Sequence, residues 1–221
     1  MASVKVFGSP TSAEVARVLA CLFEKDVEFQ LIRVDTYKGQ KRMPEYLKLQ
    51  PQGQALTFED GKMTLVDSRE ICRHIAEKYV DQGNKDLLGT GTLERASIEQ
   101  WLQTEARSFD PPSSALVFHL AFAPLMGVEQ DQEVIEESRR KLNKVLDIYE
   151  RRLQETKFLA GDKFTLADLS HLPNTQRLAS HNGCRQLITS RKKVSKWWEE
   201  ISSRPSWKRV VEMQQEPLPV I

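Results

Sequence analysis

The period of the apolar residues changes near residue 80, and this change limits the folds open to the chain. Residues 3–7 and 27–31 alternate apolar and polar side chains, as half-buried strands do. Between these two runs, apolar side chains recur at helical spacing: Val15, Val18, Leu19, Leu22 and Phe23. The chain therefore begins with a predicted strand, helix and strand.

A second group of elements follows a polar loop and a short predicted helical turn at 44–49. Two strand-like runs, 55–58 and 63–66, flank an Asp60-Gly61 pair that is typical of a hairpin turn. A helical pattern starts at Ser68. This order predicts a small sheet covered by helices, similar to a thioredoxin-like domain without a Cys-x-x-Cys pair.

Beyond a glycine-containing stretch the pattern is helical throughout. We predict an α+β protein with a thioredoxin-like domain at 1–80, a linker at 81–92 and an all-α domain at 93–221. Within the last region, Thr165 and Asp168 have the spacing of a helix capping box.

The charge balance excludes several partners. The 221 residues include 32 Lys and Arg against 31 Asp and Glu, a formal charge of +1, so no basic field favours nucleic acid or anionic membrane. No apolar stretch has the length of a membrane span, and no signal peptide is evident, so we expect a cytoplasmic protein. The three cysteines are far apart and the histidines lack metal-ligand spacing. We expect buried, reduced thiols and no metal.

Several short motifs, in order and spacing, resemble plant phi-class glutathione transferases along almost the entire chain. They are Lys-Val-Phe-Gly at 5–8, Asp-Ser-Arg at 67–69, the runs 158–162 and 164–171, and Trp-Trp-Glu-Glu-Ile-Ser at 197–202. The resemblance implies a two-domain fold and a homodimer. It also implies conjugation of the thiol of glutathione, the co-substrate, to electrophilic small molecules.

Such chemistry needs the thiol as a thiolate, which a hydroxyl at a helix start can stabilise. The position of the family's catalytic serine matches Ser12, with Thr11 as a neighbour that could substitute. Helix capping explains the same residues, because Thr11 can cap a helix in whose first turn Ser12 lies with a free hydroxyl. One turn further, Arg17 either adds positive potential near the thiolate or has a surface or domain-bridging role.

The resemblance also implies residues that bind glutathione. Lys41 keeps the charge that faces the glycyl carboxylate, and Asp67 with Ser68 matches the acid-Ser pair that holds the γ-glutamyl group, while also suiting a helix N-terminus. The full predicted set is Gln40, Lys41, Gln54, Ala55, Asp67 and Ser68.

One position departs from the family, because Leu56 stands where the cis-proline is expected. In the family, the residue before that proline pairs its backbone with glutathione, and Ala55 holds this place here. A non-proline cis bond costs about 2.5 to 4 kcal/mol, so the Ala55-Leu56 bond is either a strained cis bond or trans. Neutral drift, a shift from conjugation to binding, and a compensated active site all remain open.

An acceptor-substrate pocket between the domains is implied for an apolar or aromatic electrophile. Its predicted residues are Ala115, Leu116, His119 and Phe122. The same helical stripe is also typical of a core, and a lone histidine is more often satisfied locally than catalytic.

These residues support a glutathione transferase that uses Ser12, with activity lowered by Leu56. The alternative is a noncatalytic carrier of aromatic ligands with the same fold. A thiol-disulfide or deglutathionylating enzyme is disfavoured, since Thr11 and Ser12 stand where that chemistry needs a cysteine.

Overall fold

The computed structural model describes residues 4–34 and 55–216, which form two compact units. Unit 1 contains the described residues up to Lys85 together with the C-terminal helix α11 (Pro205–Gln215), and unit 2 spans Asp86–Arg204. The sequence prediction grouped α11 with the other helices of 93–221. In the structure, α11 packs against a helix of unit 1, and its Trp207 side chain is buried there.

Unit 1 is built on a mixed sheet with the strand order β2-β1-β3-β4. Its strands are β1 (Val4–Phe7), β2 (Phe29–Ile32), β3 (Thr57–Asp60) and β4 (Met63–Leu65). β1 pairs with β2 in parallel, and β3 is antiparallel to both β1 and β4. The parallel pair is joined through α1 (Ala13–Glu24), which confirms the predicted strand-helix-strand start. The helical turn predicted at 44–49 lies outside the described residues.

The hairpin turn lies later than the sequence prediction placed it. β3 starts at Thr57 rather than at residue 55 and continues to Asp60, because Asp60 pairs with Val4 of β1 and Met63 of β4. The two-residue turn begins at Gly61, whose φ of 64° favours glycine.

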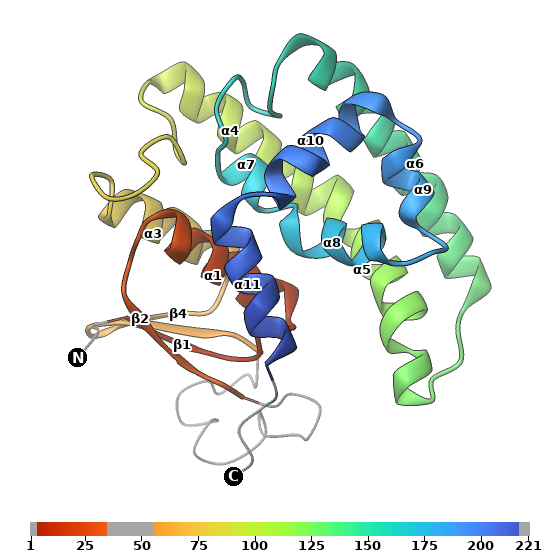
Figure 1. Ribbon diagram of the computed structural model, residues 1–221, viewed down its shortest axis with the longest axis horizontal. Coiled ribbons are helices and arrows are strands. Elements are labelled where there is room, and N and C mark those ends of the chain that lie inside the picture. The colour runs from red at the N-terminus through yellow and green to blue at the C-terminus, as the bar shows by residue number, and fades with distance from the viewer. Residues whose placement is uncertain (1–3, 35–54, 217–221) are drawn as a thin grey trace. The chain divides into compact units, whose positions relative to one another are not determined.

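The helices of unit 1 pack on the sheet and on one another. α1 contacts α3 (Ser68–Lys78) and α11, and Figure 1 shows these three helices above the strands. Val6 and Phe58, paired across β1 and β3, are fully buried. The core of unit 1 thus joins β1, the strand that precedes α1, to its antiparallel neighbour β3.

Unit 2 is helical. Its α-helices are α4 (Thr92–Thr104), α5 (Asp110–Val117), α6 (Gln132–Glu155), α7 (Leu166–Leu169), α8 (Leu172–Ser180), α9 (Arg185–Thr189) and α10 (Lys192–Ser202). Together with the mixed sheet of unit 1, these helices confirm the predicted α+β class. None of the helices within the described ranges is long and apolar enough to cross a membrane.

Two π-helical turns and a 3₁₀ turn interrupt the helices around α5. They are η2 (Glu105–Phe109), η3 (Phe118–Phe122) and η4 (Pro124–Met126). η2 leads directly into the prolines at the start of α5. Proline lacks the N–H that a helical hydrogen bond needs. A wider π-helical turn before the prolines accommodates the missing hydrogen bonds.

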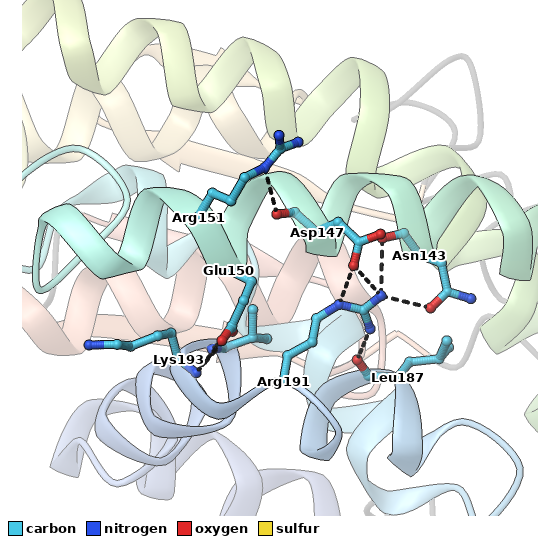
Figure 2. Close-up of polar contacts among 8 residues, drawn as sticks. Asn143, Asp147, Glu150, Arg151, Leu187, Arg191 and Lys193 are labelled. Atoms are coloured by element: carbon cyan, nitrogen blue, oxygen red, sulfur yellow. Dashed lines mark hydrogen bonds and ion pairs between the residues drawn. The ribbon is translucent and has the colours of Figure 1, made fainter.

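Polar side chains hold α10 to α6, as Figure 2 shows. The Glu150 carboxylate accepts hydrogen bonds from the backbone N–H groups of Lys193 (2.9 Å) and Val194 (2.9 Å), which are free donors at the start of α10. Arg191, just before α10, donates from Nη2 to Asp147 over 2.7 Å. The start of α10 is therefore capped by a residue 43 positions earlier in the chain.

The capping box predicted from the sequence is present in the structure. Thr165 precedes α7, and both of its reciprocal hydrogen bonds with the third residue of the helix, Asp168, are formed. Asp168 is completely buried, and its carboxylate also accepts from the backbone of Leu159 over 3.1 Å.

Candidate functional site

Ser12 is the N-cap of α1. Its φ of −71° and ψ of 135° are extended, and its carbonyl accepts the hydrogen bond of Ala16 over 2.9 Å. Thr11 therefore does not cap this helix, and Ser12 is not in its first turn, which corrects the capping prediction. The extended conformation of Ser12 places the helix boundary one residue later.

The Ser12 hydroxyl makes no capping bond, and no partner for it exists among the described residues. Ser12 is half-buried, at the N-terminus of a 12-residue helix. The two preceding hydroxyls bond to each other instead, since Ser9 Oγ and Thr11 Oγ1 share a hydrogen bond of 2.8 Å. A free hydroxyl donor at the positive end of a helix is suited to an anion.

The backbone before β3 lies close to the end of β1. A Cβ at Gly8 would stand only 2.5 Å from the Ala55 carbonyl oxygen, and the φ of Gly8 is 147°. Only glycine permits this approach without displacement of the backbone. Gly8 thus brings the Ala55 backbone beside the segment that leads to Ser12.

The Ala55-Leu56 peptide bond is trans, since no peptide bond of the described ranges is cis. This resolves the two conformations left open by the sequence. Leu56 is fully buried and Ala55 is half-buried. The Leu56 side chain thus packs in unit 1, while Ala55 is partly accessible.

Asp67 and Ser68 lie at the start of α3. Asp67 is the N-cap, and its exposed carboxylate accepts from the backbone N–H groups of Arg69 (2.9 Å) and Glu70 (3.0 Å). Ser68 is the first residue of the helix and is buried. The helix-cap interpretation of Asp67 is thereby confirmed. Its carboxylate already accepts from two of the backbone N–H groups that the start of α3 leaves without helical partners.

Arg17 reaches Ser68 from α1. The guanidinium Nη1 donates to Ser68 Oγ over 2.7 Å, and only 2% of Arg17 is exposed. The surface role considered for Arg17 is therefore wrong, because the residue is buried. The sequence signal is a charged residue inside the apolar run of α1.

Two thiols form further hydrogen bonds between α1 and α3. Cys72 Sγ donates to the Arg17 carbonyl over 3.7 Å, and Cys21 Sγ donates to the Cys72 carbonyl over 3.6 Å. Both cysteines are free and buried, and burial raises the pKa of the Cys21 thiol well above its ordinary value. The structure therefore confirms buried thiols that are packed as small apolar groups.

Comparisons with known proteins agree with this geometry. Residues 2–77 match the family "Glutathione S-transferase, N-terminal domain", and residues 112–205 match "Glutathione S-transferase, C-terminal domain". Glutathione S-transferase F10 of Arabidopsis thaliana is 48% identical over 202 residues, which are 91% of this chain and 94% of that protein. The chain belongs to the phi class of the glutathione S-transferase family.

Solved transferase structures share the fold. The crystal structure of glutathione transferase F2 from Populus trichocarpa has a TM-score of 0.93 at 57% identity, with 96% of this chain and 99% of that chain covered. Maize glutathione S-transferase I, solved in complex with an atrazine glutathione conjugate, has a TM-score of 0.88 at 29% identity, with coverage of 97% and 99%. The predicted thioredoxin-like and helical architecture of this family is thereby confirmed.

The transferase residues predicted for the acceptor pocket lie around the end of α5. Leu116 is fully buried, whereas Ala115, His119 and Phe122 are partly exposed. His119 has local partners, because its Nδ1 accepts from the Asp131 backbone N–H over 3.3 Å. This contact agrees with the expectation that a lone histidine is satisfied locally.

Three predicted glutathione ligands, Gln40, Lys41 and Gln54, lie outside the described residues. Within the described ranges, no group of His, Cys, Asp and Glu side chains has the arrangement of a metal site. The described part of the candidate site therefore consists of Ser12, Ala55, Asp67 and Ser68, and the structure shows that Arg17 contacts Ser68.

Proposed function

We propose that this transferase uses Ser12 to stabilise the thiolate of glutathione for attack on electrophilic small molecules. One observation carries this proposal. The Ser12 hydroxyl, at the N-terminus of α1, has no hydrogen-bond partner among the described residues. A free thiol with a pKa of about 8.5 is mostly protonated at neutral pH. A hydrogen bond to the sulfur favours the charged form, and the positive end of α1 adds to it.

Glutathione would bind through both of its ends. Asp67 and Ser68 would hold the γ-glutamyl group, Ala55 and Gln54 the peptide, and Gln40 with Lys41 the glycyl carboxylate. The exposed Asp67 carboxylate, placed at the start of α3, supports the first assignment because it can accept from the γ-glutamyl ammonium. The relatives are named transferases, so a noncatalytic carrier is not favoured.

The trans bond before Leu56 is expected to weaken glutathione binding. Two backbone hydrogen bonds from Ala55 are involved, and each contributes about 0.5 to 1.5 kcal/mol. Their loss corresponds to roughly ten- to a hundredfold in affinity. We therefore propose a transferase of low activity.

The acceptor would be an apolar or aromatic electrophile in contact with Ala115, His119 and Phe122, with Leu116 behind them. Partly exposed aromatic and aliphatic side chains at the end of α5 support this assignment. We further propose a homodimer in the cytoplasm. Sedimentation of the purified protein and the location of a fluorescent fusion test these two points.

The Ser12→Ala variant tests the catalytic assignment. We expect the pKa of the bound glutathione thiol, followed by thiolate absorbance against pH, to rise by about 1 to 2. We also expect turnover of an aryl halide at neutral pH to fall by roughly ten- to a hundredfold. Ser195→Ala, on α10, is the matched control and should change neither quantity.

The same measurements define the contrary results. An unchanged thiol pKa with unchanged turnover in Ser12→Ala would remove Ser12 from the mechanism. Wild-type protein that binds immobilised glutathione but turns over no aryl halide would restore the carrier alternative. Absence of both binding and turnover would contradict the proposed function.

A further inference from the structure

We infer that Arg17 is a positioning residue that aims the Ser68 hydroxyl at the γ-glutamyl carboxylate of glutathione. This inference rests on the proposed function, because it concerns the same binding site. It assigns a role to a residue of α1 for which the sequence left several roles open.

The direction of the hydrogen bond carries the inference. A guanidinium can only donate, so in the 2.7 Å contact between Arg17 Nη1 and Ser68 Oγ the serine oxygen is the acceptor. The single proton of the Ser68 hydroxyl then remains for another acceptor. A carboxylate is an acceptor only, and it therefore matches the hydroxyl that Arg17 leaves as a donor.

The charge of Arg17 strengthens this donor. A hydrogen bond from a cation draws electron density from the serine oxygen and makes the O–H a better donor. Both residues are only 2% exposed, so water screens the interaction weakly.

The position of Arg17 is set by the packing of α1 on α3. Arg17 and Cys21 are four residues apart on α1, and Ser68 and Cys72 are four apart on α3, so each pair lies on one helical face. The hydrogen bond from Cys72 Sγ to the Arg17 carbonyl joins these faces. The guanidinium is thus presented to Ser68 by two rigid elements.

The test is a double-mutant cycle on the full-length chain with glutathione as the probe. Arg17→Met and Ser68→Ala should each weaken glutathione binding by about tenfold in titration calorimetry. The double variant should bind about as well as Ser68→Ala alone, because Arg17 acts through that hydroxyl. Losses that multiply to about a hundredfold would overturn the inference.

Kinetics separate positioning from a general structural effect. In Arg17→Met the KM for glutathione should rise about tenfold while kcat at saturating glutathione changes less than about twofold. Arg17→Lys should recover part of the affinity, because it keeps the charge but not the planar donor. Arg140→Met, an exposed residue of α6, is the matched control. A fall in kcat with an unchanged KM would contradict the positioning role.

Two outcomes require separate interpretation. If Arg17→Met does not fold, the cycle of Arg17→Lys with Ser68→Ala gives the same comparison with the charge kept, and multiplying losses again overturn the inference. If the wild-type protein does not bind glutathione, the proposed function and this inference both fail. Additive losses in a protein that binds glutathione overturn this inference alone.

Discussion

The indole Nε1 of Trp197 donates a hydrogen bond to the buried carboxylate of Asp168 over 2.9 Å. Trp197 belongs to α10 and Asp168 to α7, so this bond joins the capping box to the packing of another helix. Burial raises the pKa of Asp168 from 3.8 to about 6, although the bonds from Trp197, Leu159 and Thr165 act in the opposite direction. This carboxyl group is a source of pH-dependent stability in unit 2.

Asp168→Asn tests that dependence. A pKa above the unfolded value gives stability that is complete below about pH 4 and is lost as the pH rises to about 6. The unfolding free energy of the wild type relative to Asp168→Asn should therefore fall by about 3 kcal/mol over this interval. Urea unfolding at several pH values measures it, with the exposed Asp26→Asn as control. A difference that grows with pH would contradict the prediction.

Asp60 should give a pH dependence of stability opposite to that of Asp168. Burial acts to raise the pKa of Asp60, but hydrogen bonds from His74 (3.0 Å) and Lys78 (2.5 Å) outweigh it and hold the pKa below its ordinary value. The resulting stability is present above the unfolded pKa and is lost as the pH falls through the folded pKa. The advantage of the wild type over Asp60→Asn should decline below about pH 4 in the same urea experiment. A constant difference between about pH 5 and 2.5 would exclude this linkage.

Leu56→Pro, alone or with Ala55→Val, tests the backbone before β3. If loop geometry limits function, glutathione affinity should rise by roughly ten- to a hundredfold as the Ala55 backbone groups become available. The fully buried Leu56 side chain is lost, so the free energy of unfolding should fall by about 1 to 3 kcal/mol. Titration calorimetry and urea unfolding measure the two effects. Unchanged affinity would show that other positions control glutathione binding.

Glu150→Ala tests the contact between α6 and α10. Removal of the carboxylate leaves the amides of Lys193 and Val194 without their acceptor, so the free energy of unfolding should fall by about 1 to 2 kcal/mol. Glu150→Gln keeps one acceptor oxygen and should lose less. Glu136→Ala, with an exposed side chain on the same helix, is the control in thermal unfolding. An equal loss in Glu136→Ala would contradict the capping role.

Most of the fold was open to prediction because its signals are local. The alternation in β1, the helical spacing in α1 and the Thr165-Asp168 capping box each depend on residues close together in the chain. The boundary at Ser12 was less accessible, since Ser9, Thr11 and Ser12 are all good caps and only the backbone angles distinguish them. The start of β3 at Thr57 rather than residue 55 follows from its pairing with β1, which begins at Thr57 opposite Phe7.

The sequence prediction of the candidate site rested on the resemblance to phi-class transferases, which marked Ser12, Asp67 and Ser68. The structure places all three at the starts of helices, while their roles stay predictions. The burial of Arg17 was not accessible in this way, since it follows from how α1 and α3 pack. The sequence also left the Ala55-Leu56 bond open, because its isomer depends on the surrounding structure.

By itself, the sequence determined the strand-helix-strand start of unit 1, its hairpin and the change of period near residue 80. The tertiary structure alone decided that α11 belongs to unit 1, that the bond before Leu56 is trans, and that Arg17 meets Ser68. The physical reason is the distance along the chain over which each kind of interaction acts. Periodicity and capping act between neighbours in the chain, whereas burial and the direction of a hydrogen bond depend on which distant segments pack together.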